Sequence, residues 1–134
     1  MKLSLNRNLP LTVRLDLDTM RKIVHLQLEA IEKFPPISTL SSVSYLILRR
    51  AVADKSTEEL AKEVADVRHL WLRHILTIRI DPETDEKLSY VAKTLGLDGG
   101  KSLVASRLVV KHAPATTIED LIHQWKKELF PHLP

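Results

Sequence analysis

Two short segments of this 134-residue chain carry the same hydrogen-bonding side chains in the same order. Residues 11–16 read Leu-Thr-Val-Arg-Leu-Asp, and residues 76–81 read Leu-Thr-Ile-Arg-Ile-Asp. The polar side chains that recur between aliphatic ones are Thr12 and Arg14 in the first segment, and Thr77 and Arg79 in the second. A threonine hydroxyl donates one hydrogen bond and accepts up to two, and an arginine guanidinium can bind two acceptors at once. The chemistry that these residue types offer is therefore hydrogen-bond donation to a ligand.

The rest of the chain lacks the residue patterns of an enzyme or a metal site. There is no cysteine, which excludes a disulfide scaffold, a Cys-ligated zinc site and thiol chemistry. No Gly-x-Ser-x-Gly motif is present, and the three glycines, all between Gly96 and Gly100, form no phosphate-binding loop. The six histidines do not have the spacing of a zinc site. We expect no catalytic activity, no cofactor and no bound metal.

The amino-acid composition indicates which classes of binding partner are possible. The 20 basic and 17 acidic residues leave a net charge of +3, which permits a polyanionic partner without requiring one. Aromatic residues make up 4% of the chain, too few for the stacking surfaces of single-strand binders. No apolar run is long enough to span a membrane, and residues 1–10 contain no apolar signal segment. We therefore expect a cytoplasmic protein that does not bind membranes.

The repeated segments have the period of half-buried strands, and a helix is expected after each. The first helix is expected to begin at Asp16 or Asp18 and to end before Pro35-Pro36. In the second copy Asp81 is the expected N-cap, and Gly96 the expected C-terminal stop. The side chains expected to form the apolar face of the first helix are Met20, Ile23, Val24, Leu26, Leu28 and Ile31.

A second helix is predicted in each copy, beginning near Ser41-Ser42 and near Lys101-Ser102. This gives two strand-helix-helix units, 10–53 and 75–113, within a single core of residues 10–113. A helical connector over 56–73, with a capping box at Ser56, is predicted between them, and a C-terminal amphipathic helix over 116–130.

A single strand cannot satisfy its own backbone hydrogen bonds, so we expect the two strands to pair with each other. An antiparallel pair would direct the aliphatic side chains of residues 11–16 and 76–81 onto the helices and leave the threonines and arginines exposed. The predicted fold is mainly helical with one two-stranded antiparallel ribbon.

This arrangement resembles the ribbon-helix-helix superfamily of prokaryotic DNA-binding proteins, here as two tandem copies in one chain. The resemblance rests on the two repeated segments and on the helix starts at Ser41-Ser42 and Gly100-Lys101-Ser102. Tandem copies are similar to the accessory proteins of conjugative relaxosomes. Residues 46–54 look most like part of the overdrive-binding accessory protein of T-DNA border processing.

The resemblance implies that the ribbon enters the major groove of double-stranded DNA, as a core that is monomeric because both strands lie in one chain. The residues implied to contact bases are Thr12, Arg14, Thr77 and Arg79. Those implied to contact phosphates are Ser41, Ser42, Gly100, Lys101 and Ser102. The simpler interpretation makes the serines helix N-caps and the threonines and arginines solvated surface.

Three functions follow from these expectations. The first is sequence-specific DNA binding as an accessory protein of conjugative or T-DNA transfer, in plasmid biology, with a relaxase or another DNA-processing protein as partner. The second is a transcriptional repressor or antitoxin-like autoregulator, because one fold serves both roles. The third, from another class, is a helical protein-interaction adaptor that uses the C-terminal helix and Trp125.

Overall fold

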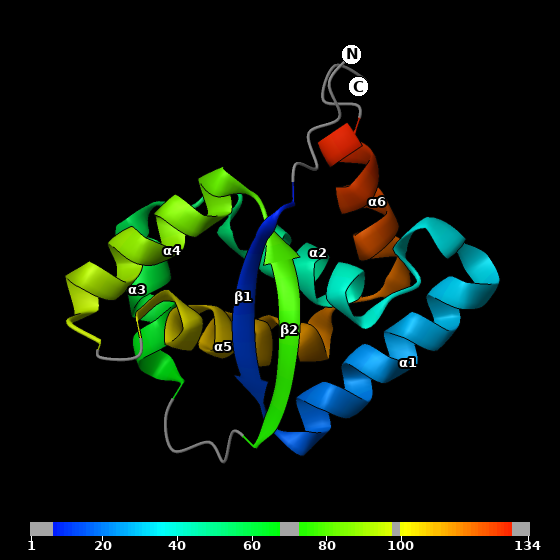
Figure 1. Ribbon diagram of the computed structural model, residues 1–134, viewed down its shortest axis with the longest axis horizontal. Coiled ribbons are helices and arrows are strands. Elements are labelled where there is room, and N and C mark those ends of the chain that lie inside the picture. Colours follow the sequence, from blue (N-terminus) through cyan, green and yellow to red (C-terminus); the bar gives the residue numbers. More distant parts are fainter. Residues whose placement is uncertain (1–6, 68–72, 98–99, 130–134) are drawn as a thin grey trace.

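One strand followed by three helices occurs twice along the chain. The computed structural model describes residues 7–67, 73–97 and 100–129. The first half contains strand β1 (Leu9–Leu15) and helices α1 (Leu17–Lys33), α2 (Leu40–Val52) and α3 (Thr57–Asp66). The second half contains strand β2 (His74–Ile80) and helices α4 (Pro82–Leu95), α5 (Gly100–His112) and α6 (Ile118–Leu129). Short 3-10 turns, η1 (Pro35–Ile37) and η2 (Ala113–Ala115), precede α2 and α6 (Figure 1).

The two strands form one antiparallel ribbon, so the prediction of a mainly helical chain with a two-stranded antiparallel sheet is confirmed. The register places Thr12 opposite Thr77. Side chains alternate between the two faces of the ribbon, as expected for β structure. The aliphatic side chains of the inner face are buried, namely Leu11, Val13, Leu15, Ile78 and Ile80, and Leu76 is partly buried.

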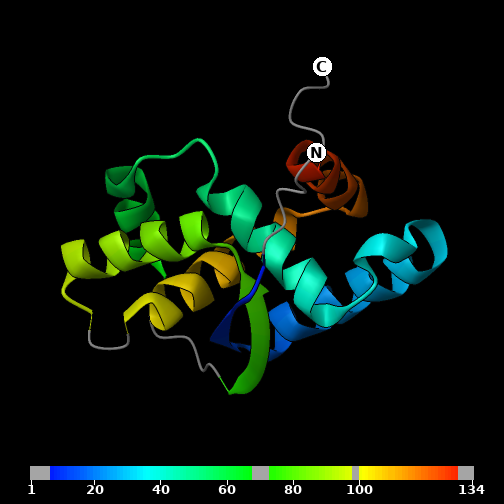
Figure 2. The same ribbon diagram turned by 45° about the horizontal axis from the view of Figure 1, so that its top comes forward.

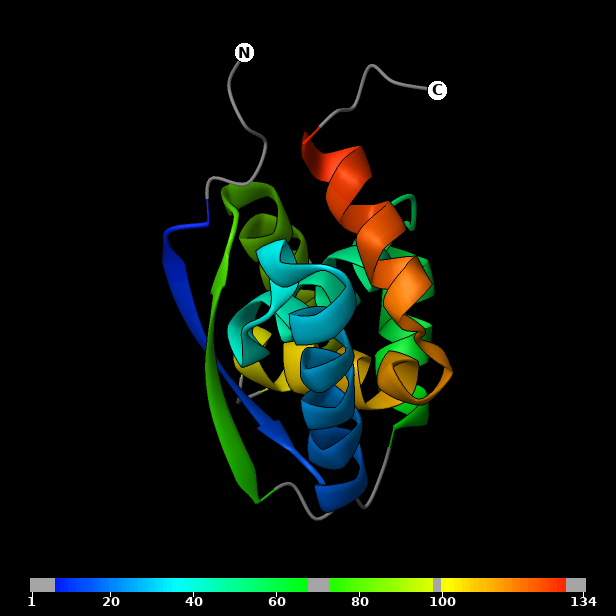
Figure 3. The ribbon, with the colours of Figure 1, turned by 90° about the vertical axis from the view of Figure 1, so that its right-hand side faces the viewer.

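All the described helices lie on one side of the ribbon, and no described element covers its other face (Figures 1 and 3). Helix α5 packs along β1, and helix α2 packs along β2. Each second helix therefore contacts the strand that does not precede it directly in the chain. The core lies between the ribbon and these helices, with Leu46, Ile47, Leu108 and Val109 fully or almost fully buried.

The third helix of each half also packs on the other half. Helix α3 contacts α4 and α5, whereas α6 contacts α2 and, less extensively, α1 (Figure 2). Leu60 and Val64 bury the inner side of α3, and Ile118 and Leu121 that of α6. These helices are thus part of the core rather than appendages to it.

Helix termini follow the expected local chemistry in most places. The Asp81 side chain accepts a hydrogen bond from the Thr84 amide at the start of α4, and Gly96 ends that helix in a left-handed conformation, at φ 62°. The Ser56 side chain caps α3 by accepting from the Glu59 amide. In α2, however, the cap is Thr39, whose side chain accepts from the Ser42 amide, so Ser41 and Ser42 lie inside the first turn.

The expected apolar face of α1 is only partly buried. Ile23 and Leu26 lie in the core, but Val24, Leu28 and Ile31 are 37%, 57% and 52% exposed, so this part of the prediction is wrong. The reason is packing: α1 contacts mainly α2 and the two 3-10 turns, which cover one side of it. Of the helical connector expected over 56–73, α3 covers 57–66, because Val67 is extended and ends the helix. Residues 68–72, including Trp71, lie outside the described residues, and Arg73 is not helical.

Among the described residues, no helix combines the length and the hydrophobicity needed to cross a bilayer.

Candidate functional site

The outer face of the ribbon presents the four predicted donor side chains together. Thr12 and Arg14 of β1 and Thr77 and Arg79 of β2 are all exposed. The two threonines are directly opposite each other, and each arginine lies two residues further along its own strand. Because the strands are antiparallel, the arginines lie on opposite sides of the threonine pair. The face therefore has hydroxyl groups at its centre and one guanidinium toward each end.

Serines of α2 and α5 hold the two outer edges of the ribbon. The Arg14 amide donates to Ser106 Oγ of α5 at 2.8 Å, and the Arg79 amide donates to Ser41 Oγ of α2 at 3.3 Å. The Ser102 hydroxyl donates to the carbonyl oxygen of Thr12. Edge strands otherwise leave such backbone groups unpaired. These contacts tie each edge of the ribbon to one of the second helices.

Arg7 joins the ribbon to the N-terminus of α2. Its two terminal nitrogens donate to Ser41 Oγ and Ser42 Oγ, each at 3.2 Å, and its Nε donates to the carbonyl oxygen of Arg79 at 3.1 Å. The guanidinium also lies 4.5 Å from the centre of the Tyr45 ring. Burial lowers the pKa of Arg7, against the attraction of Tyr45 and Asp81, but an arginine keeps its charge at neutral pH.

A polar network beneath Arg7 joins α2, α4 and α6. The Tyr45 hydroxyl donates to Asp81 Oδ1 at 2.7 Å, and burial together with this bond raises the pKa of Tyr45. Arg49 pairs with Glu128 at 2.8 Å and lies 3.9 Å from Asp81. Burial alone would lower the pKa of Arg49, but the bond to Glu128 and the neighbouring carboxylates raise it. This network holds the helix that carries Ser41 and Ser42 in a fixed position.

The N-terminus of α5 lies at the other edge of the ribbon. Gly100 begins the helix at φ 58°, a left-handed conformation that glycine adopts without strain. The Lys101 ammonium pairs with Asp85 at 2.6 Å. Ser102 contacts the Thr12 carbonyl, as described above. The predicted residues thus form two clusters, Ser41 and Ser42 beside β2 and Gly100 to Ser102 beside β1.

Arg7 is a site residue that the repeated segments do not predict. The repeat offset of 65 residues aligns it with Leu72, so the second copy offers no matching arginine. Its only sequence signal is a basic residue just before the first strand, which fits a basic N-terminal arm equally well. Its position became evident only through the hydrogen bonds to Ser41, Ser42 and Arg79.

The assembled surface offers hydrogen-bond donors and positive charge. It has three guanidinium groups, an ammonium and the start of two helices, whose free amide groups attract anions. In the described ranges, no group of three or more His, Asp or Glu side chains is arranged to hold a metal. The arrangement suits a ligand that carries many acceptors and negative charge.

Comparison of the chain with protein-family models, curated proteins and solved structures finds no match. The site is therefore interpreted from its own geometry and chemistry.

Proposed function

We propose that this protein binds double-stranded DNA by inserting the ribbon into the major groove. The observation that carries this proposal is the exposed row of Thr12, Arg14, Thr77 and Arg79 on the open face of an antiparallel ribbon. A major groove is wide enough for a two-stranded ribbon, and its base edges carry a distinct donor and acceptor pattern for each base pair. Arginine suits guanine O6 and N7, and threonine suits an acceptor or a thymine methyl group.

The strand register supports a tandem ribbon-helix-helix arrangement related by an approximate two-fold axis. Thr12 pairs with Thr77, which is its own counterpart in the repeat, so the axis would pass between them. This axis would relate Arg14 to Arg79. It would also relate the bond from the Arg14 amide to α5 to the bond from the Arg79 amide to α2. We expect the preferred DNA site to be an imperfect inverted repeat, because the residues around the equivalent pairs differ.

Phosphate contacts on either side of the groove would come from the starts of α2 and α5. Beside β2, Arg7, Ser41 and Ser42 form a cluster of donors with a guanidinium already in place. Beside β1, Lys101 and the first amides of α5 would play the same part. A phosphate at the first cluster would replace the serine hydroxyls as the acceptor of Arg7, a stronger charge-assisted interaction.

The biological role that we favour is assembly of a DNA-transfer complex, with a relaxase or related enzyme as partner. This rests on the resemblance of residues 46–54 and on the tandem arrangement. A repressor or autoregulator would use the same ribbon. Recovery of the bound sequence distinguishes them: a site near a nick site favours transfer, and one that overlaps a promoter favours repression.

A second candidate from another class, a helical protein-interaction adaptor, has one observation in its favour. Helix α1 exposes an apolar row that no other described element covers, formed by Leu17, Val24, Leu28 and Ile31. Trp125, which the sequence suggests as a partner contact, packs edge-to-face on Phe34 at 5.1 Å between ring centres. An adaptor of this kind would bind no DNA.

The decisive experiment selects duplexes from a random pool with the full chain and then measures binding of the recovered site by fluorescence anisotropy. Arg14→Ala and Arg79→Ala should each cost about 1–3 kcal/mol on that site and relax preference at one base position. Lys126→Ala, on the exposed side of α6, is the charge-matched control and should change affinity little.

The salt dependence separates the two kinds of contact. Lys101→Ala should weaken binding to every sequence and reduce the salt slope by about one. If Arg14→Ala and Arg79→Ala reduce the affinity for selected and random duplexes equally, these arginines do not recognise bases. Absence of any enriched sequence, together with no salt-sensitive binding, would overturn DNA binding itself.

A further inference from the structure

A cavity of about 420 Å³ lies between the C-terminal parts of α2 and α5 and the helix α6. Its outer wall, α6, lies on the side of α2 away from the ribbon (Figure 3). The cavity is therefore separate from the surface proposed to contact DNA. Its size falls within the ordinary range of small-molecule sites.

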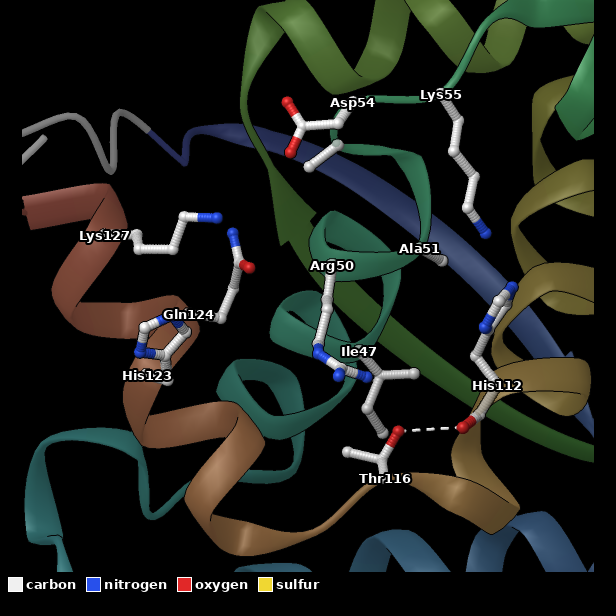
Figure 4. Close-up of a pocket in the computed structure, with 11 residues that line it drawn as sticks. Ile47, Arg50, Ala51, Asp54, Lys55, His112, Thr116, His123, Gln124 and Lys127 are labelled. Atoms are coloured by element: carbon white, nitrogen blue, oxygen red, sulfur yellow. Dashed lines mark hydrogen bonds between the residues drawn. The ribbon is translucent and has the colours of Figure 1, made fainter.

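The charged side chains that line this cavity are mostly cationic. Arg50 of α2, Lys55 of the α2–α3 connection and Lys127 of α6 come from three different segments, and Asp54 is the one carboxylate in the described lining. His112 is also part of the wall. In Figure 4 the Lys127 side chain extends from α6 toward α2, Arg50 runs toward Ile47 and Thr116, and Lys55 points toward His112. Cations from three separate segments that line one concavity favour a ligand with more than one negative charge.

Glu63, a carboxylate outside the lining, orients one of these cations, Lys55. Glu63 accepts from Lys55 Nζ at 2.9 Å and is 2.7 Å from His112 Nε2. Partial burial raises the pKa of Glu63, but the hydrogen bonds from Lys55 and His112 outweigh it, so the pKa is lowered and Glu63 stays ionised. Glu63 thereby holds Lys55 against the cavity wall without lining the cavity itself.

The other two cations are available to a ligand at small cost. Arg50 lies 3.4 Å from Asp120 in a half-exposed pair, and such pairs contribute little to stability. Lys127 forms no ion pair with any residue of the described ranges. A bound anion would therefore gain two charge-assisted contacts without breaking a buried one.

The other residues that line the cavity indicate which part of a ligand it would bind. Ile47 and Ala51 supply aliphatic surface, and none of the described lining residues is Phe, Tyr or Trp. The Arg50 guanidinium and the Lys127 ammonium match phosphate oxygens, the first as a fork and the second as a point charge. We propose that this cavity binds a small polyphosphate ligand, of the class of nucleoside di- and triphosphates, through its phosphate chain.

The test uses isothermal titration calorimetry of the full chain with sodium tripolyphosphate and, separately, with ATP. Sodium chloride at matched ionic strength is the reference titration. Arg50→Gln and Lys127→Gln remove one cation each, and Lys126→Gln removes the neighbouring exposed cation of α6, which does not line the cavity. Circular dichroism melting of each variant verifies that it is folded.

We expect saturable binding of one tripolyphosphate per chain, and a similar affinity for ATP. Arg50→Gln and Lys127→Gln should each weaken it roughly tenfold, the loss of one charge-assisted contact, while Lys126→Gln leaves it unchanged. Absence of saturable binding, or an equal loss in all three variants, would overturn the proposal. Binding of ATP without binding of tripolyphosphate would overturn recognition through the phosphate chain. Because the probes contain no DNA, failure here is distinguishable from failure of DNA binding.

Discussion

Two buried serines, one in the second helix of each half, differ in their hydrogen bonding, and this difference predicts opposite effects of the same substitution. Ser106 of α5 is 1% exposed and Ser44 of α2 is 0% exposed. Ser106 Oγ accepts from the Arg14 amide at 2.8 Å and donates to the Ser102 carbonyl at 2.7 Å. Ser44 Oγ has no hydrogen-bond partner within the described part of the chain. Ser106→Ala should therefore destabilise the fold, and Ser44→Ala should stabilise it.

The magnitudes follow from the hydrogen bonds. Ser106→Ala removes the acceptor of the Arg14 amide at the edge of the ribbon. The loss of this hydrogen bond should lower the free energy of unfolding by about 1–2 kcal/mol. Ser44→Ala relieves a buried hydroxyl that forms no hydrogen bond, which should gain about 1 kcal/mol. Alanine also favours a helix over serine, by about 0.5 kcal/mol, but this gain is common to both variants and cancels. The two variants should differ by about 2–3 kcal/mol.

Urea unfolding followed by circular dichroism measures the free energy of unfolding of each variant and of the unsubstituted chain. Equal slopes against urea would show that the compactness of the unfolded state has not changed. The predicted difference corresponds to roughly 10 °C between the melting temperatures. If both substitutions shift stability in the same direction by similar amounts, the Ser106 bond does not hold the ribbon edge and the reasoning fails.

Two further predictions concern the start and the end of α4. Burial would raise the pKa of Asp81, but bonds from Thr84 and Tyr45 lower it below its ordinary value near 4, so the ionised form stabilises the fold above that pH. This contribution is lost as the pH falls through the lowered pKa of Asp81 in the folded protein. In the Asp81→Asn variant, the urea midpoint should therefore decline less steeply below about pH 4 than in the unsubstituted chain. An equally steep decline would contradict a stabilising role of the ionised Asp81. At the other end Gly96 adopts φ 62° with no atom within 4 Å of an added Cβ, so Gly96→Ala should cost about 1–2 kcal/mol through backbone strain alone. Gly96→Asn should cost less by the same urea measurement, and an alanine variant as stable as the unsubstituted chain would contradict the left-handed cap.

The parts of the fold that depend on local rules could be predicted from the sequence. Alternation over residues 11–16 and 76–81 predicted both strands, because a half-buried ribbon requires that period. The capping role of Asp81 and the stop at Gly96 follow from side-chain acceptors and backbone freedom that act within a few residues. The repeat predicted that the strands would pair, since neither has another partner in the sequence.

What could not be predicted depends on neighbours distant in the chain. Periodicity showed that α1 has an apolar side, but not that the other elements would leave Val24, Leu28 and Ile31 uncovered. The serine pattern at residues 41–42 suggested caps, whereas Thr39 takes the cap and frees Ser41 to hold the ribbon edge. Arg7 is assigned to the site by its contacts with Arg79 and Ser41, which are distant in the chain and which a local sequence pattern cannot reveal.

The way in which the halves interlock makes the ribbon a property of the whole chain. Helix α2 follows β1 but packs along β2, and helix α5 follows β2 but packs along β1. Residues 7–67 alone would contain a strand with no partner and a second helix with no strand beneath it. An unpaired strand leaves its backbone donors and acceptors unsatisfied, and a two-stranded ribbon needs further packing to be stable. The face that carries Thr12, Arg14, Thr77 and Arg79 therefore forms only when both halves are folded together, and because both lie in one chain its formation does not depend on protein concentration.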